Sequence, residues 1–262
     1  MSTQWIVTEK KNHMTTVTLN RPEKRNALNG EMIDLLLASL KKIAHDKSCR
    51  VFMICGAGDV FCAGGDIAWM KEMAEKNEAE NVADALLLAD CLYQLYQMPM
   101  PTIALAQGTI LGGGVGLLCA CDMVIASNNA QFGFSEVKLG LSPSTISPYV
   151  IRAIGERATR YYFLTGERFS SEIAKRLGLV HLIVNQNELA QKGDAMAHLL
   201  LQNSPEALQA CKSLIHAISL KEVTPNLNQT TAKHLSKRRA SKEAKEGLRA
   251  FLEKRTPHWN DT

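Results

Sequence analysis

The chain has 262 residues, 46% of them hydrophobic and 21% charged, and a formal net charge of +4. This length and composition allow a large buried core that needs neither a metal ion nor disulfides, and no apolar run reaches the roughly 18 to 20 residues of a bilayer span. The seven cysteines lack the paired spacing of a zinc site, and the chain does not start with a basic segment followed by an apolar one. We therefore expect a cytoplasmic protein with reduced thiols, no bound metal and no transmembrane segment.

The first part of the chain alternates short strands with helices. Strand-like runs at residues 15–19 and 51–55 lie on either side of a helical pattern over 29–44, in which apolar residues recur every three or four positions. A second helical pattern over 81–97 ends where two prolines follow, and it leads into an apolar run at 102–106 that suits a buried parallel strand. This order predicts βαβ units and an α/β fold.

Beyond residue 106 a glycine-rich turn opens a helix, and the pattern then becomes mainly helical. The predicted strands lie at 122–126, 130–134 and 179–184, and the predicted helices at 145–154 and 159–164. The change to helical composition near residue 200 is the one plausible boundary. It divides the chain into a core, residues 1–199, and a helical region, residues 200–262.

The helical region carries a concentrated basic segment. Residues 233–255 contain nine Lys and Arg against three Glu, and the simplest interpretation is a solvated helix face with charge pairs four residues apart. A positive rim for the phosphates of a nucleotide-like ligand is the functional alternative. Nucleic-acid binding is disfavoured, because no aromatic residues are interleaved to stack on bases. A basic, amphipathic helical tail would most naturally pack on a second copy, which favours a homo-oligomer.

Two glycine-rich turns, at residues 61–67 and 111–116, are the strongest candidate binding features. Each follows a strand-like run and enters a helix, so unpaired backbone amides at the positive ends of two helix dipoles could hold one oxygen together. Neither turn has the Gly-Lys-Ser/Thr of a phosphate loop or the spacing of a dinucleotide-binding loop. Taken singly, either turn is explained better by the close packing of a helix.

Four segments in order, residues 19–29, 61–67, 112–122 and 130–140, resemble the crotonase (enoyl-CoA hydratase/isomerase) superfamily in sequence and spacing. The resemblance covers nearly the whole chain. It implies a crotonase fold of repeated ββα units with a helical C-terminal trimerisation region, in homotrimers that often pair into homohexamers. It also implies an acyl-CoA substrate, of which coenzyme A is a part, and an active site between the two turns with no separate cofactor.

Carried over position by position, the resemblance makes the backbone amides of Gly65 and Gly113 an oxyanion hole for the thioester oxygen. Fixed donors aimed at the charge of an enolate contribute roughly 3 to 4 kcal/mol each. The resemblance also implies substrate-binding residues near both turns: Lys24, Arg25, Ala27, Leu28, Ala63, Gly65, Asp66, Ile67, Ala68, Gly113 and Gly116. Lys24 or Arg25 could pair with a phosphate of coenzyme A, although both are equally well explained as solvated residues of a polar turn.

Glu136 matches the carboxylate that handles the α-proton in the family. It follows an apolar strand, where partial burial would raise its pKa towards a range useful for proton transfer. From the residues alone, a glutamate at the start of a helix after Ser135 is an equal explanation. The resemblance favours Glu136 as the catalytic acid/base.

The chain departs from the family's hydratases at Gly116, where those enzymes generally place a second glutamate. A glycine cannot orient or deprotonate water, which leaves three alternatives. The chain is a hydratase in which Glu136 acts alone or another group holds the water, an isomerase that moves a proton with Glu136 alone, or a non-catalytic acyl-CoA- or RNA-binding protein.

A finer resemblance favours the hydratase. The glycine at position 116 and the segment 138–155 are similar to bacterial methylglutaconyl-CoA and isohexenylglutaconyl-CoA hydratases. This similarity implies a branched enoyl thioester from leucine or acyclic-terpenoid breakdown, with room beside Gly116 for the branch. Lys138 and Arg152 are then the candidate partners for a distal carboxylate.

Overall fold

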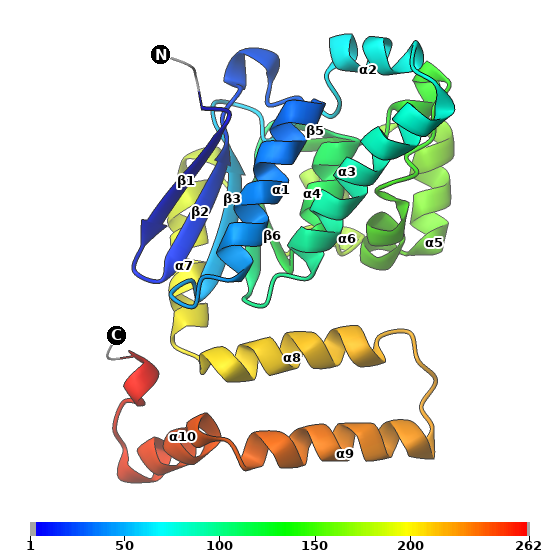
Figure 1. Cartoon of the computed structure of the whole chain (residues 1–262). Helices are drawn as coiled ribbons and strands as arrows, with labels where there is room; N and C mark the ends of the chain where they lie inside the picture. The colour runs from blue at the N-terminus through cyan, green and yellow to red at the C-terminus, as the bar shows by residue number, and fades with distance from the viewer. Residues whose placement is uncertain (1–3, 261–262) are drawn as a thin grey trace.

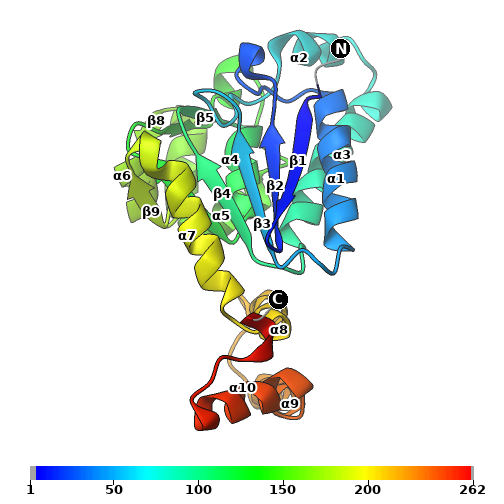
Figure 2. The same cartoon turned by 90° about the vertical axis from the view of Figure 1, so that its left-hand side faces the viewer.

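The computed structural model describes residues 4–260 and shows an α/β core with a layer of helices below it (Figures 1 and 2). The larger sheet has the order β1-β2-β3-β4-β6-β9 and is parallel except for the β1–β2 pair. Its strands are β1 (Ile6–Lys11), β2 (Met14–Leu19), β3 (Val51–Gly56), β4 (Thr102–Ala106), β6 (Met123–Ser127) and β9 (Leu182–Val184). A smaller sheet joins β5 (Thr109–Leu111), β7 (Gln131–Gly133) and β8 (Arg168–Ser170) in the order β5-β7-β8.

Helices cover both faces of the larger sheet. Helices α1 and α3 lie on one face and α7 on the other (Figure 2). Successive residues of β3 point to opposite faces of the sheet. Phe52 and Ile54 pack in the core under α1 and α3, whereas Val51 and Met53 pack in the core under α7. The helices of this part are α1 (Gly30–Ala44), α2 (Ile67–Ala74), α3 (Glu78–Tyr96), α4 (Gly113–Ala120), α5 (Ser147–Thr165), α6 (Ser171–Arg176) and α7 (Leu189–Leu201).

Most of the predicted elements are present within two or three residues of their predicted limits. The helix expected over 29–44 is α1, whose N-cap Asn29 accepts from the Met32 amide at 3.0 Å. The two helices expected over 145–154 and 159–164 form α5, which is interrupted at Gly155 with φ 76° and ψ 159°. Strand β1 was not predicted, and the strand expected over 179–184 is only three residues long.

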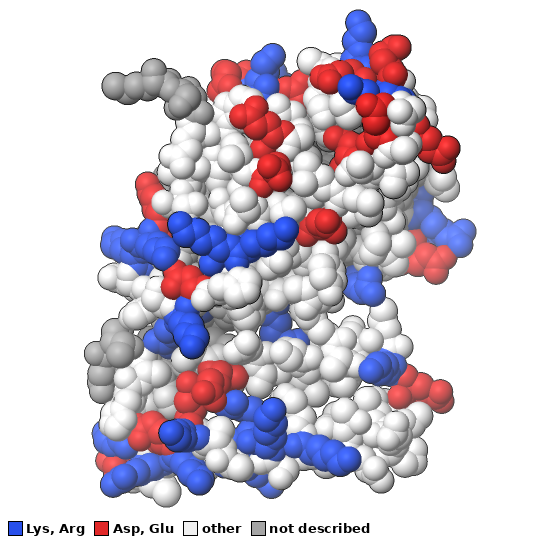
Figure 3. Space-filling model, viewed as in Figure 1, with Lys and Arg blue, Asp and Glu red and all other residues white. Residues whose placement is uncertain are grey.

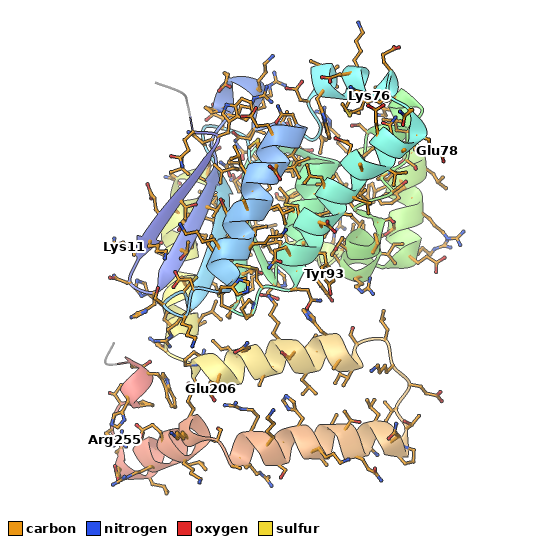
Figure 4. All side chains as sticks on the ribbon, viewed as in Figure 1. Lys11, Lys76, Glu78, Tyr93, Glu206 and Arg255 are labelled. Carbon is orange, nitrogen blue, oxygen red and sulfur yellow. The ribbon has the colours of Figure 1, made fainter. Side chains whose placement is uncertain are left out.

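The chain leaves the core after α7 and continues through α8 (Pro205–Ile218), α9 (Pro225–Arg239) and α10 (Lys242–Glu253). Lys212 of α8 attaches this layer to the core by donating to Asp122 at 2.7 Å. Within the layer, Arg238 of α9 pairs with Glu206 at 3.2 Å. Glu206 lies at the start of α8 (Figure 4). None of the helices between residues 4 and 260 combines the length and apolar character needed to cross a bilayer.

The helical layer exposes apolar side chains within a single chain. Phe251 and Leu252 of α10 are 81% and 79% exposed, and Leu248 lies on the same helix at 63%. Contiguous exposed apolar surface of this kind is typical of protein contacts. The homotrimer or homohexamer expected from the sequence stays a prediction.

Candidate active site

The first glycine turn is held against the segment that precedes α1. Leu28 forms a parallel bridge with Gly65: the Leu28 amide donates to Gly64 O, and the Asp66 amide donates to Leu28 O, each at 2.7 Å. Gly64 has a φ of 95°, which favours glycine. Among residues 4–260 the Gly65 amide has no hydrogen-bond acceptor, so it remains available to a ligand.

A buried ion pair fixes this turn. Arg21 donates to Asp66 at 2.8 Å, and both side chains are only about one tenth exposed. Burial alone would raise the pKa of Asp66, but hydrogen bonds from the Ala68 amide and from Arg21 lower it on balance. Asp66 thus caps α2 and holds the turn to residues 21–28. Asp66 was predicted to bind substrate, but it does not line the cavity between the two glycine turns.

The second glycine turn connects β5 to α4. Gly112 has φ 45° and ψ −115°, a conformation that residues with a side chain rarely adopt, and its amide donates to Gly133 O at 3.0 Å. Gly113 is the first residue of α4, where backbone amides have no partner within the helix. Its amide has no acceptor among the described residues. Both predicted oxyanion donors are therefore unpaired.

A cavity of about 370 Å³ joins the two turns. Its walls are both glycine turns, the start of α2, the middle of α3, Glu136 and the loop 142–146, and most of the lining is apolar. The predicted site residues in its walls are Leu28, Ala63, Gly65, Ile67, Gly113 and Glu136. A wider hollow of about 550 Å³ lies between the end of α1 and α8 and contains none of the predicted site residues.

Glu136 lies at the start of a 3-10 turn, η2 (Glu136–Leu139), and reaches the second glycine turn. Its Oε1 atom is 2.6 Å from the point where a β-carbon on Gly112 would lie. Its Oε2 atom is buried without a hydrogen-bond partner among residues 4–260. Burial raises the pKa of the Glu136 carboxyl, partly offset by a hydrogen bond from its own backbone amide. A half-buried carboxyl with an unpartnered oxygen, inside a cavity, suits proton transfer.

The room expected beside Gly116 is absent, so that prediction is wrong. A β-carbon on Gly116 would lie 2.4 Å from Cγ2 of Ile146 and 3.6 Å from Cδ1 of Leu92. Gly116 is buried and does not line the cavity. The space that a second carboxylate side chain would need is filled by Ile146.

The predicted cationic partners lie outside the cavity. Arg152 is exposed and donates to Pro148 O at 3.0 Å, and the Lys138 side chain packs towards Gly166. Lys24 and Arg25 are exposed on and after the turn η1 (Pro22–Lys24), and neither lines the cavity. Ala27 and Ala68 also lie outside its lining.

The basic segment 233–255 is also remote from the cavity. It forms part of α9 and α10, which lie below the core, whereas α2, which contributes to the cavity wall, lies at the opposite end of the molecule (Figure 1). Lys and Arg gather over the C-terminal helices and the adjacent core, and acidic residues predominate around α2 and α3 (Figure 3). The segment therefore cannot form a positive rim for a ligand bound to the same chain.

Two parts of the cavity wall were not among the predicted site residues, although the segment 138–155 carried the finer resemblance. Trp69 and Met70 of α2 close one side, and Ser144, Thr145 and Ile146 close another. The apolar spacing of α2 does not distinguish residues that face a ligand from residues that face the core. Nothing in the local sequence indicates that Ile146 packs against a helix thirty residues earlier.

The sequence model of the enoyl-CoA hydratase/isomerase family matches residues 9–262. The chain belongs to this family, and it is an enzyme of the enoyl-CoA hydratase/isomerase class with the crotonase fold.

Similar proteins match this chain over almost its full length. A Legionella pneumophila crystal structure assigned to the enoyl-CoA hydratase/isomerase (crotonase) class superposes with a TM-score of 0.95 at 39% identity, covering 99% of this chain and 100% of that one. A Thermus thermophilus protein assigned as an enoyl-CoA hydratase is 34% identical, over 97% of this chain and 100% of its own. The 2,3-dehydroadipyl-CoA hydratase of Escherichia coli is 32% identical, over 96% and 97%.

Proposed function

We propose that the protein adds water to the double bond of an α,β-unsaturated acyl-CoA, with Glu136 as the acid/base. The observation that carries the proposal is the unpartnered, buried Oε2 atom of Glu136 in the cavity that also contains the unpaired amides of Gly65 and Gly113. The names of the Thermus and Escherichia relatives support the same reaction class. Coenzyme A enters as part of the substrate, and the scheme uses no separate cofactor.

The reaction needs one proton acceptor that later becomes a donor. The Gly65 and Gly113 amides bind the thioester oxygen, and the Glu136 carboxylate takes a proton from water as the water oxygen bonds to the β-carbon. The electrons of the double bond move to the thioester oxygen, which the two amides stabilise as an enolate. The Glu136 carboxyl then returns its proton to the α-carbon, so that the net change is one added water. A raised pKa makes the carboxylate a stronger base for the first step.

Isomerisation of a 3-enoyl-CoA to the 2-enoyl isomer is the second candidate. Glu136 would remove a proton from the α-carbon and return it to the γ-carbon through the same enolate. The cavity wall supports this alternative, because Ile146 fills the space that a second carboxylate would need and Glu136 is the one Asp or Glu of residues 4–260 that lines the cavity.

A branched, carboxylated chain of the methylglutaconyl type is the substrate implied by the finer sequence resemblance. The cavity gives it little support. The space beside Gly116 is filled, and no Lys, Arg or His side chain of residues 4–260 lines the cavity. A carboxylate buried without a partner costs several kcal/mol, of the order of the penalties measured for buried ions.

The test is turnover of crotonyl-CoA, 3-methylglutaconyl-CoA and a 3-enoyl-CoA in parallel, in ¹⁸O-labelled water, by wild type and Glu136→Gln. We expect a hydrated product that contains solvent oxygen, with a rate about 100-fold or more lower in the variant. Glu156→Gln, which changes an exposed carboxylate paired with Arg160 on α5, is the matched control and should retain the wild-type rate. Conversion of the 3-enoyl substrate alone would contradict hydration and support isomerisation. No conversion of any bound thioester would contradict both proposals.

A further inference from the structure

Ile146 occupies a position in the cavity that the hydration mechanism does not use. It is the last residue before α5, only 2% exposed, and it lines the cavity. We propose that Ile146 is the specificity-determining residue of the acyl pocket. It takes up space in the cavity that contains Glu136 and disfavours acyl chains with a branch at the β-carbon. This inference rests on the proposed function for the placement of the acyl chain.

The packing against α4 places Ile146 beside the acid/base. Gly112 and Gly116 are four residues apart at the start of α4, and the Gly116 amide donates to Gly112 O at 3.1 Å, so both lie on one face of the helix. A β-carbon on Gly112 would meet Oε1 of Glu136 at 2.6 Å, and one on Gly116 would meet Cγ2 of Ile146 at 2.4 Å. Glu136 and Ile146 therefore pack against successive parts of the first turn of α4, and both line the same cavity.

Alkyl side chains pack around Ile146 and around the Gly113 amide. Leu92 lies behind Ile146, 3.6 Å from the β-carbon position of Gly116, and is fully buried. Leu28 and Leu88 lie 3.1 Å and 3.9 Å from the β-carbon position of Gly113, so alkyl groups also flank the oxyanion amide. An acyl chain bound through its thioester oxygen therefore runs between alkyl side chains.

Ile146 takes up part of the volume on this side of the cavity, which limits substituents on the chain. The substrate atom nearest to an acid/base in this chemistry is the α- or β-carbon, so a methyl branch on the β-carbon would compete with Ile146 for space. A single methylene in an apolar pocket changes discrimination by about tenfold or more. Shortening Ile146 should therefore shift the preference of the pocket towards branched chains by about that factor.

The experiment is calorimetric binding of two saturated thioesters, butanoyl-CoA and 3-methylbutanoyl-CoA, to wild type, Ile146→Ala and Ile146→Val. We expect wild type to prefer the straight chain, and Ile146→Ala to shift the ratio of the two dissociation constants about tenfold towards the branched chain. Ile146→Val, which loses one methylene and is less prone to misfolding, should shift the ratio in the same direction by a smaller factor than Ile146→Ala. Ile154→Ala is the matched control, because Ile154 is a core residue of α5 outside the cavity lining, and it should leave the ratio unchanged.

An unchanged ratio in both Ile146 variants, or an equal shift in Ile154→Ala, would overturn the proposal. Saturated thioesters are not hydrated, so this test does not depend on turnover. If the ratio of dissociation constants shifts but the protein converts no enoyl-CoA, the proposed hydration is contradicted and the role of Ile146 is supported. Wild type that binds neither thioester would overturn both.

Discussion

Two side chains pack on the same face of α4 and differ in their chemistry. Glu136 lies over Gly112 with one carboxyl oxygen unpartnered, whereas Ile146 lies over Gly116 and is almost fully buried among apolar groups. In both places a glycine allows the partner to approach the helix backbone directly. Glu136 is a half-buried polar group whose ionisation burial disfavours, whereas Ile146 is an apolar cavity-lining residue whose burial contributes about 1.5 to 3 kcal/mol.

The same kind of close packing on glycine can thus hold a polar group for the proposed proton transfer and an apolar group that both stabilises the core and lines the cavity. The comparison also predicts different effects for substitutions at Gly112 and Gly116. A side chain at position 112 would displace the acid/base, and a side chain at position 116 would compress the core. The three predictions below test this separation, in order of expected effect.

The largest effect is expected for Gly112→Ala. The new β-carbon would lie 2.6 Å from Oε1 of Glu136, and the φ of 45° adds backbone strain of about 1 to 3 kcal/mol. Displacement of an acid/base by about 1 Å typically costs about 100-fold in rate. We expect kcat to fall by that factor while the dissociation constant of butanoyl-CoA changes by less than about threefold.

Gly155→Ala is the control for strain alone. Gly155 has φ 76° with nothing within 4 Å of its β-carbon position, and it lies in α5 outside the cavity lining. It should lower Tm without lowering kcat. If both variants lose activity equally, the contact between Gly112 and Glu136 is not what positions the carboxylate.

A smaller effect is expected for Gly116→Ala, and it should appear in stability. Overpacking against Ile146 costs about 1 to 3 kcal/mol, which corresponds to a drop in Tm of about 5 °C. Ile146→Ala alone should cost about 2 to 5 kcal/mol through the cavity that it creates. Because the new methyl group would enter that cavity, the double variant should lose at least about 1 kcal/mol less than the sum of the two single losses. Strict additivity in thermal or denaturant unfolding would show that the two positions do not touch.

Local sequence predicts the parts of the site that are encoded locally. Each glycine turn lies between a strand and a helix, and Glu136 follows an apolar strand, so the two unpaired amides and the half-buried carboxyl could be anticipated. Strands β2 and β3 and helix α1 likewise follow from their periodicity. Strand β1 was missed because its sequence, IVTEKK, has no apolar alternation and most of its residues are exposed.

The contacts between distant segments could not be predicted in this way. The absence of a side chain at Gly116 suggested open space, but whether space remains depends on Ile146, which approaches from another element. The Arg21–Asp66 pair joins positions 45 residues apart. From the sequence, other basic residues near Arg21 were equally plausible partners for Asp66. A glycine therefore predicts close approach without identifying the group that approaches.

The smallest effect is expected for the stability of Glu136→Gln as a function of pH. Burial raises the folded-state pKa of Glu136, so the folded state holds its proton more tightly than the unfolded state. Stability from this group is therefore present below the unfolded pKa and is lost as pH rises through the folded pKa. At a pH above the folded-state pKa the ionised carboxylate destabilises the fold, so Glu136→Gln should raise Tm at high pH, and the gain should shrink as pH falls towards the unfolded pKa.

Glu156→Gln, at an exposed carboxylate, should leave Tm within about 1 °C of wild type at every pH. A Glu136→Gln variant that is less stable than wild type at pH 8 would mean that the carboxylate has a stabilising partner in solution. The contrast with Ile146 would then be lost, because both side chains packed on α4 would stabilise the fold.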